Sequence, residues 1–349
     1  MGVWNMIENT YLRWLASETP SIYWHDSAMI DEVDAAISNG AVGVTTNPFL
    51  AQATLRSQPD FWKNQGISTV SVAEGDLRAE YLITQVAAMI ARKVLPFQAG
   101  GFGHGYCCAQ LNPNRPGSQV VMTPQAERYA GIAENIVIKI PATQAGLVVL
   151  EDCAAKGYHV AATVSFTVAQ VLAVAEAYQR GATRCRASGK KPGLGIAVLM
   201  VGRLDDYLRD VMQESGGPAT EDDIIWAGTA AIKRAYGIFQ ERGYESILMP
   251  AGCRGSYHIT ELAGGRMIMS IAPKIAAQLS QLSGPFTRHI DAAVEPAIIR
   301  RLLTMREFAK AYEPDCMAPE EFITYGSTNR TLTQFCDNGW NILQTLIIP

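Results

Sequence analysis

Short apolar runs alternate with helical patterns along almost the whole chain. Eight of these runs have the length and composition of buried strands. They cover residues 21–25, 42–46, 106–111, 136–140, 160–164, 195–201, 246–250 and 267–271. Strands that alternate with helices in this way indicate a parallel sheet covered by those helices. The pattern therefore predicts an α/β protein.

Polar and glycine residues mark the expected ends of the intervening helices, because Ser and Thr favour helix starts and Gly favours helix ends. The expected boundaries are a capping box of Ser71 and Glu74, then Thr143 to Gly157, Thr167 to Gly181, and Thr220 to Gly243 with Glu221, Asp222 and Asp223 in its first turn. Beyond residue 285 the pattern stays helical, most clearly over residues 298–312.

These elements predict a single (β/α)8 TIM barrel with a helical insertion before the third strand and a helical C-terminal extension. The insertion covers residues 55–105. The barrel is expected over residues 1–284, and the extension, packed on it, over residues 285–349. An open doubly wound sheet is the alternative, and it would favour a GxGxxG fingerprint after an early strand. The glycine-rich segment 100–105 precedes a strand and lacks that spacing, so we predict a loop there.

The composition is that of an ordinary globular protein of 349 residues, with 48% hydrophobic and 18% charged residues. A net charge of −4 gives no reason to expect nucleic acid or an anionic membrane as partner. No apolar stretch approaches the roughly 18 residues of a membrane span. The first twenty residues lack an apolar signal core, and the seven cysteines lack a metal-type spacing. We expect a cytoplasmic protein without a metal. An oligomer of identical chains is compatible with this composition.

Lys139 is the most informative single residue, because it lies within the apolar run 136–140. A buried charge is costly unless it is paired or neutralised. A buried lysine commonly has a lowered pKa, and its neutral amine can attack a carbonyl carbon to form a Schiff base. The alternative is a lysine that is salt-bridged at the end of a strand.

Other polar residues end the neighbouring strands, where the chemistry of such a barrel is located. They are Asp26, Thr45, Asn47, Gln110, Asn112, Thr163, Arg203 and Arg254. Each also has a structural interpretation. Asp26 or Asn47 can cap the next helix, and Arg203 can pair with Asp205 or Asp206.

Several segments in this set resemble the transaldolases, including the related fructose-6-phosphate aldolases. The matching segments are Thr45-Thr46-Asn47-Pro48, Val137-Ile138-Lys139-Ile140-Pro141-Ala142-Thr143, Thr163 with Phe166 and Ala169-Gln170, Val201-Gly202-Arg203, and Ala251-Gly252-Cys253-Arg254 followed by Glu261-Leu262-Ala263-Gly264. They occur in the family's order between about residues 21 and 273. The resemblance implies a Schiff-base enzyme on a (β/α)8 barrel.

By that resemblance, Lys139 forms the Schiff base and Asp26 takes the proton from the C4 hydroxyl of the substrate as the C3–C4 bond breaks. Asn47, with Thr45 and Asn112 nearby, binds the substrate, and Gln110 and Thr163 hold a catalytic water. Arg203 and Arg254 bind an anionic tail. Guanidinium groups suit such a tail, whether it is a phosphate or a sulfonate.

The chain departs from the typical transaldolases at several of these positions. Gln110 replaces a catalytic glutamate, as it does in the fructose-6-phosphate aldolases, and a glutamine cannot act as a general base. Those aldolases place a tyrosine where this chain has Met200. Val198 and Gly252 replace serines near the sugar and the phosphate. The donor therefore need not be a standard pentose-phosphate intermediate.

We expect an enzyme that uses no cofactor and transfers a dihydroxyacetone unit from an anionic ketose, such as a sugar phosphate, to an aldehyde acceptor. The alternative is an aldolase that releases free dihydroxyacetone. A non-catalytic sugar-phosphate-binding barrel would keep Arg203 and Arg254 without the Lys139–Asp26 pair. A nicotinamide-dependent reductase would need a cofactor site, for which the sequence gives no sign.

Overall fold

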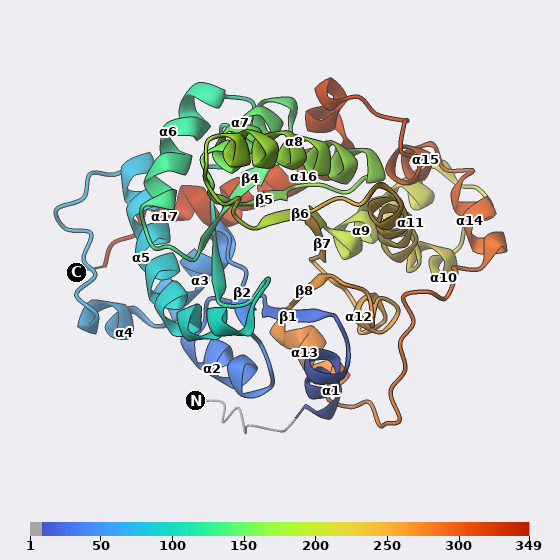
Figure 1. The fold of residues 1–349 in the computed structure, drawn as a ribbon, viewed down its shortest axis with the longest axis horizontal. Helices are drawn as coiled ribbons and strands as arrows, with labels where there is room; N and C mark the ends of the chain where they lie inside the picture. Colours follow the sequence, from blue (N-terminus) through green and yellow to red (C-terminus); the bar gives the residue numbers. More distant parts are fainter. Residues whose placement is uncertain (1–8, 349) are drawn as a thin grey trace.

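The computed structural model describes residues 9–348 and consists of eight parallel strands surrounded by helices (Figure 1). The strands are β1 (Ile22–His25), β2 (Gly43–Val44), β3 (Tyr106–Gln110), β4 (Ile136–Pro141), β5 (His159–Thr163), β6 (Gly195–Leu199), β7 (Ile247–Pro250) and β8 (Ile268–Ile271). Their order is β7-β6-β5-β4-β3-β2-β1-β8. All of the predicted strands are confirmed, and the α/β barrel is correct.

The two ends of this order, β7 and β8, lie next to each other in Figure 1 and complete the ring. Among the described residues no ladder of hydrogen bonds joins these two strands, so the (β/α)8 barrel is nearly rather than fully closed. The open doubly wound sheet is excluded, because β1 to β7 follow one another in sequence order and β8 lies between β1 and β7 to complete the ring.

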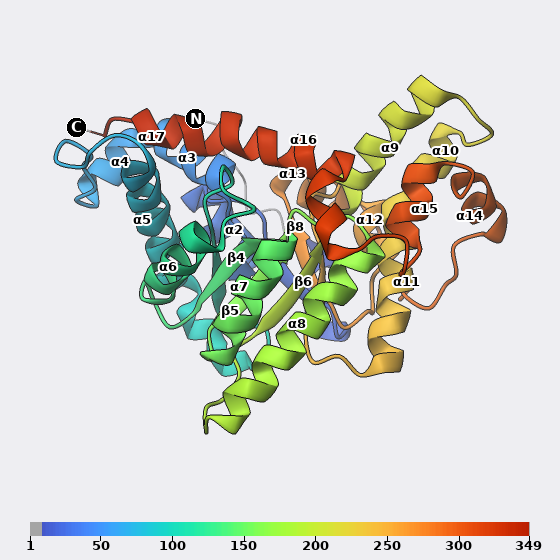
Figure 2. The ribbon, with the colours of Figure 1, turned by 90° about the horizontal axis from the view of Figure 1, so that it is seen from above.

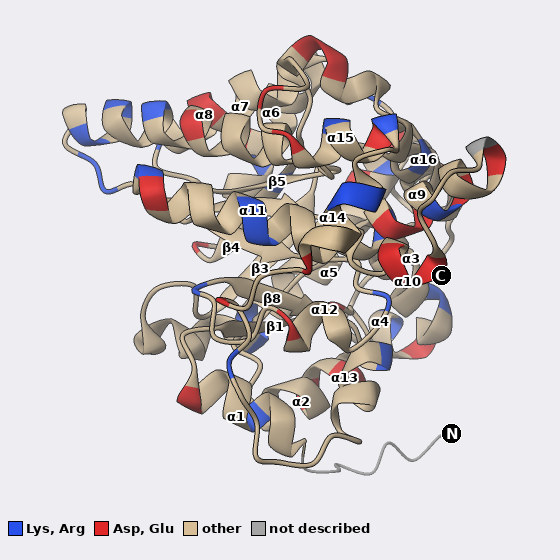
Figure 3. Ribbon diagram, turned by 90° about the vertical axis from the view of Figure 1, so that its right-hand side faces the viewer, with Lys and Arg blue, Asp and Glu red and all other residues tan. Residues whose placement is uncertain are grey.

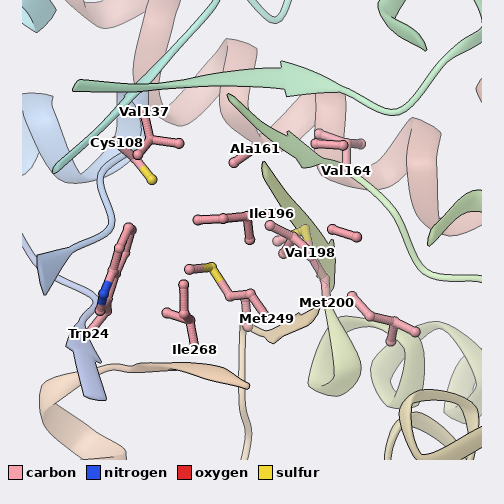
Figure 4. Packing of buried hydrophobic residues seen from close by; sticks show 14 of the residues in the cluster. Trp24, Cys108, Val137, Ala161, Val164, Ile196, Val198, Met200, Met249 and Ile268 are labelled. Carbon is pink, nitrogen blue, oxygen red and sulfur yellow. The ribbon is translucent and has the colours of Figure 1, made fainter. Parts of the chain in front are cut away.

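Apolar side chains fill the inside of the barrel (Figure 4). Residues from opposite strands point toward one another there, among them Trp24, Val137, Ile196 and Met249. A Cβ atom at Gly43 would lie 2.5 Å from the indole of Trp24, so only glycine leaves room for that ring. Strands that are buried on both faces need continuous apolar sequence, which explains why the apolar runs predicted the strands so well.

The helices surround these strands and also form the insertion and the extension. They are α1 (Thr10–Glu18), α2 (Ile30–Ser38), α3 (Pro48–Ser57), α4 (Pro59–Asn64), α5 (Asp76–Val94), η1 (Leu95–Gly100), α6 (Gln119–Ala130), α7 (Gln144–Ala155), α8 (Val168–Ala187), α9 (Val201–Ser215), α10 (Glu221–Ile224), α11 (Ala227–Arg242), α12 (Tyr257–Thr260), α13 (Pro273–Leu279), α14 (Pro296–Leu302), α15 (Arg306–Tyr312), η2 (Pro319–Thr324), α16 (Gly326–Phe335), η3 (Cys336–Trp340) and α17 (Asn341–Thr345). The predicted insertion over residues 55–105 is helical, as expected, and contains α4, α5 and η1.

Two of the predicted helix starts are confirmed by their side-chain caps. Thr143 accepts a hydrogen bond from the backbone of Gly146 at 3.0 Å, and Thr167 forms a capping box with Gln170. The predicted stop at Gly181 is wrong, because α8 continues to Ala187. Instead, Gly181 lets α8 approach α7 closely, since a Cβ atom there would lie 2.4 Å from the carbonyl oxygen of Glu151.

Two other helix predictions are partly or wholly wrong. The capping box of Ser71 and Glu74 does not form, because α5 begins after Gly75 and Glu74 pairs with Arg78 instead. Thr220 does cap a helix, but the chain breaks after α10 and starts again as α11. The buried carboxylate of Asp205 accepts a hydrogen bond from the backbone of Gly228 at 2.8 Å, which stabilises this second start.

The chain after residue 285 is helical, as predicted, although the expected stretch 298–312 is two helices, α14 and α15. The following α16, η3 and α17 form one long run at one side of the barrel, from α9 to α5 (Figure 2). The division into a barrel over residues 1–284 and an extension over residues 285–349 stays a prediction.

Basic and acidic residues are interspersed over the helices on the side of the molecule shown in Figure 3. In the described part of the chain, no helix combines the length and the apolar character that crossing a membrane requires.

Candidate active site

The predicted site residues of the central strands point into the same end of the barrel. Gln110 on β3 is in register with Lys139 on β4, and Thr163 on β5 is in register with Pro141, two residues beyond the lysine. Residues in register, and residues two positions apart on one strand, lie on the same face of a sheet. Gln110, Lys139 and Thr163 therefore all face the interior at the carboxyl end of the strands, which we call the barrel mouth.

Lys139 is buried, with 4% of its surface exposed. Its recorded hydrogen-bond contact runs from Nζ to the carbonyl oxygen of Thr46 at 3.5 Å. Among the described residues no carboxylate lies within 4.0 Å of this amine, so the predicted alternative of a salt-bridged lysine is wrong. A structural ion pair therefore does not explain why this amine is buried.

Asp26 follows β1 and is held by a chain of hydroxyl groups. Thr45 Oγ1 donates a hydrogen bond to Asp26 Oδ1 at 2.7 Å and lies 2.8 Å from Ser270 Oγ. Because the hydroxyl of Thr45 has one proton, Ser270 serves as donor to Thr45 in this chain. Asp26 does not cap the next helix, since α2 begins after Met29 without a side-chain cap. The structural interpretation of Asp26 is therefore wrong.

The charges of both Asp26 and Lys139 act on the buried thiol of Cys108. Burial raises the pKa of this thiol to about 11, while the charge of Lys139 lowers it and the charge of Asp26 raises it. Both charged groups thus act on one buried sulfur atom, which points into the barrel (Figure 4). The amine contacts the carbonyl oxygen of Thr46 and the carboxylate accepts from the hydroxyl of Thr45, so both groups lie against the same end of β2.

Gln110 and Thr163 have hydrogen-bonding capacity to spare. Gln110 Oε1 and Thr163 Oγ1 are both buried without a hydrogen-bond partner among residues 9–348. Leaving such a buried atom unsatisfied costs about 1–3 kcal/mol. The next residue, Val164, has a φ of +57°, which is strained for a β-branched residue. Strain and unused polar atoms together are typical of a site that receives a ligand or a water molecule.

Asn47 and Asn112 are engaged in local structure through their side-chain oxygens. Asn47 Oδ1 caps α3 by accepting from the backbone of Leu50 at 3.0 Å, as its structural interpretation predicts. Asn112 Oδ1 accepts from the backbone of Asn114 at 2.9 Å. Each amide nitrogen has no recorded partner within the described residues. Both side chains can therefore donate to a substrate hydroxyl while keeping their structural bond.

Arg203 and Arg254 lie together beyond β6 and β7. Burial and, next, the charge of Arg254 lower the pKa of Arg203 to about 10. A Cβ atom at Gly202 would lie 2.7 Å from Arg254 Cγ, so the start of α9 packs directly on the segment that carries Arg254. Two cations near each other destabilise each other's charged form unless negative charge compensates them.

Both arginines already have protein partners. Arg203 donates from Nη1 to Gln334, and its guanidinium lies 5.2 Å from the centre of the Phe335 ring. Arg254 donates to Asp206 at 2.7 Å and to the carbonyl oxygen of Gly252 at 3.1 Å. The predicted pairing of Arg203 with Asp205 or Asp206 is therefore wrong, because Asp206 binds Arg254 instead.

A buried pair that the sequence did not reveal connects the two arginine segments. His258 Nε2 and Asp205 Oδ2 are 2.8 Å apart, and both side chains are fully buried. His258 Nδ1 accepts a hydrogen bond from the backbone of Arg254 at 3.1 Å, which leaves its proton on the side of Asp205. Asp205, two positions after Arg203, thus contacts His258, four positions after Arg254. That spacing is visible in the sequence, but it has a meaning only once both segments are known to lie together.

Comparison with protein families finds a match to the model described as Transaldolase/Fructose-6-phosphate aldolase over residues 23–322. All of the candidate residues lie within that range. Transaldolase A of Pasteurella multocida (strain Pm70) is 28% identical over 193 residues, which are 55% of this chain and 55% of that protein. Transaldolase of Thiobacillus denitrificans is 27% identical over 202 residues, 56% of this chain and 55% of that protein. The chain thus matches about half the length of these curated relatives.

Among solved structures, oxaloacetate acetylhydrolase in complex with the product oxalate aligns with 94% of this chain and 96% of that chain. The TM-score is 0.34 and the sequence identity 15%, a level of similarity that carries no argument.

Proposed function

Because the chain belongs to the transaldolase/fructose-6-phosphate aldolase family, we propose that it transfers a dihydroxyacetone unit from a ketose to an aldehyde acceptor through a Schiff base on Lys139. The observation that carries this proposal is the buried amine of Lys139, which has no carboxylate partner among the described residues and lies at the same end of β2 as Asp26. The pair provides a nucleophile and a base at the barrel mouth.

In this mechanism, the amine of Lys139 adds to the ketone carbon of the donor, and loss of water gives an iminium ion. Asp26 Oδ takes the proton of the C4 hydroxyl, the C3–C4 bond breaks, and its electron pair moves into the iminium to give an enamine. The product aldehyde leaves. The enamine carbon then attacks an acceptor aldehyde, the new alkoxide takes the proton from Asp26, and water releases the ketose product from Lys139.

The hydroxyl chain of Ser270, Thr45 and Asp26 supports this role, because it orients the carboxylate toward the site. Gln110 and Thr163 are suited to hold the water that leaves and returns, since their buried oxygen atoms are otherwise unpaired. Asn47 and Asn112 are suited to donate to substrate hydroxyl groups. Arg203 and Arg254 would bind the anionic tail, a phosphate or a sulfonate, by charge-assisted hydrogen bonds.

Reductive trapping tests the proposal. Borohydride added with a ketose phosphate should attach a three-carbon unit to Lys139, which peptide mass spectrometry would locate. Lys139→Met should show neither label nor activity. Lys233, which is largely covered and donates to the carbonyl oxygens of His289 and Ala292, is the matched control lysine. A label at Lys233, or turnover retained in Lys139→Met, would refute the assignment.

Gln110 favours a second candidate function, an aldolase that releases free dihydroxyacetone. Its unpaired Oε1 can orient water toward the enamine, but the amide cannot take a proton from that water. Gln110→Glu supplies a base there, so the pH–rate profile and the ratio of transfer to release should both change. Dihydroxyacetone and transfer product should be measured in one assay. Release from the wild-type enzyme that saturating acceptor aldehyde leaves undiminished would favour the aldolase.

A further inference from the structure

The C-terminal segment crosses the barrel mouth and contacts the residues that follow several of the strands. Gln144, after β4, donates to Glu320 at 2.8 Å. Asn114, after β3, donates to Asn341 at 3.1 Å. A Cβ atom at Gly339 would lie 2.7 Å from the backbone nitrogen of Phe49, after β2. The segment therefore lies over the end of the barrel at which Lys139 and Asp26 point inward, in agreement with its course in Figure 2.

Both ends of this crossing are fixed. At the α5 end, Trp340 Nε1 donates to Asp76 Oδ1 at 2.7 Å, and the backbone of Ile348 donates to Thr69 Oγ1 at 2.9 Å. At the α9 end, Ser327 Oγ donates to the carbonyl oxygen of Arg203 at 3.4 Å. In between, α16 runs into the π-helical turn η3, a feature that is frequent at functional sites. Hydrogen bonds thus anchor the crossing segment to the barrel at both of its ends.

The last turn of α16 holds Arg203 from two sides. Gln334 Oε1 accepts from Arg203 Nη1, and the ring of Phe335 lies beside the guanidinium. A side-chain amide carries two further donor protons on its nitrogen. Gln334 Nε2 has no recorded partner within the described residues, and Gln334 is exposed at the mouth. With its oxygen bound to Arg203, the amide presents its nitrogen next to the proposed anion site.

We propose that Gln334 is a specificity-determining residue that donates from Nε2 to the anionic tail of the substrate, beside the charged donors Arg203 and Arg254. This inference rests on the proposed function of the two arginines and adds a neutral third donor. A tetrahedral phosphate or sulfonate has three terminal oxygens that accept hydrogen bonds, so three donors from α9, the β7–α12 loop and α16 match it. The C-terminal segment then completes the substrate site.

The test compares Gln334→Glu with the wild-type enzyme. The glutamate keeps the size of the side chain and can still bind Arg203, but it replaces the amide donor with a negative charge. We expect KM for a phosphorylated substrate to rise about 10-fold or more. The rate of the Lys139 adduct with neutral dihydroxyacetone should change less than about twofold, because that ligand has no tail.

Thr333→Glu is the matched control, since Thr333 is the exposed neighbour on the same turn and gains the same charge. Equal effects of the two variants, or an equal loss on neutral dihydroxyacetone, would overturn the role of Gln334. Gln334→Met, which has neither donor nor charge, should raise KM for the phosphorylated substrate but less than Gln334→Glu. An unchanged KM in Gln334→Met would also overturn it.

A binding measurement separates this inference from the proposed reaction. Inorganic phosphate should raise the melting temperature of the wild-type protein and of Thr333→Glu, and raise that of Gln334→Glu much less. If borohydride traps nothing on Lys139 but this difference holds, the proposed reaction fails and the anion site stands. If phosphate protects all variants equally, the role of Gln334 fails whatever the trapping shows.

Discussion

The two halves of the barrel mouth differ in whether their polar side chains have hydrogen-bond partners. Around Lys139, buried polar groups lack partners within the described part of the chain. The amine has no carboxylate partner, and the side-chain oxygens of Gln110 and Thr163 accept no hydrogen bond. Around the arginines, each guanidinium already donates a hydrogen bond, Arg203 to the amide oxygen of Gln334 and Arg254 to the carboxylate of Asp206. The first region is open for a substrate that bonds covalently. The second holds its cations in place until an anion shares or replaces their partners.

Because of this difference, substitutions in the two regions should have different effects on the reaction. Damage in the open region should lower the rate of bond cleavage whatever the substrate carries. Damage in the arginine region should raise KM only for substrates with an anionic tail. A neutral three-carbon ligand that forms an adduct on Lys139 therefore tests the first region alone, and it serves as the common control in the experiments below.

The largest effect is expected for Asp26→Asn. The amide keeps the size of the side chain but cannot take the C4 hydroxyl proton, and such help is worth roughly 10²–10⁴-fold. Cleavage should fall by about that factor while borohydride still traps the adduct on Lys139. Asp31→Asn, at an exposed position on α2, is the control. Wild-type turnover in Asp26→Asn would remove the carboxylate from the mechanism and weaken the contrast between the two regions.

The sequence predicted the open region better than the arginine region, for a physical reason. Lys139, Gln110 and Thr163 are placed by strands, and an apolar strand specifies which residue ends it. The partners of Arg203 come from a helix more than a hundred residues later, which no local pattern connects to β6. Asp205 and Asp206 were nearer in sequence, so the prediction assigned Arg203 to them. The structure instead turns Asp206 toward Arg254 and buries Asp205 against His258.

A smaller effect is expected when either arginine is replaced by glutamine. Losing one hydrogen bond to a charged group costs about 1.5–3 kcal/mol, or roughly a 10- to 150-fold rise in KM for a phosphorylated ketose. Adduct formation with neutral dihydroxyacetone should be unchanged in both Arg203→Gln and Arg254→Gln. Arg180→Gln, which breaks an exposed pair with Glu151 on another face, is the control. Equal losses on neutral and phosphorylated ligands would show that the arginines support the fold rather than the tail.

A third change reaches the arginines indirectly, through the buried pair of Asp205 and His258. His258→Phe removes the partner of the Arg254 backbone nitrogen and of Asp205 Oδ2, while Asp205 Oδ1 still accepts from Gly228. It should lower the free energy of unfolding by about 1–3 kcal/mol. KM for the phosphorylated ketose should rise a few-fold, because the Arg254 segment loses its anchor, while the adduct with neutral dihydroxyacetone is retained.

A double-mutant cycle with Asp205→Leu checks this coupling. Residues in direct contact give non-additive changes, so the double variant should lose less stability than the sum of the single variants. His258→Asn, whose side-chain oxygen can accept from Arg254, should restore part of the KM. Additive losses of stability, or a KM that His258→Asn does not restore, would show that His258 has no influence on the arginine region.

The smallest expected effect concerns pH. Arg203 has its pKa lowered to about 10, first by burial and then by Arg254, so it is still charged at neutral pH. At pH 9 only about a tenth of such a group is neutral. Sulfate, whose own charge is constant in this range, should therefore compete with a phosphorylated substrate almost equally at pH 7 and pH 9. Its inhibition should weaken as the pH passes 10, because Arg203 then loses its proton, and Arg203→Gln should remove that dependence. A loss of sulfate binding centred near pH 8 in the wild-type enzyme would mean that another titrating group binds the anion. It would contradict the assignment of the substrate tail to the arginine region.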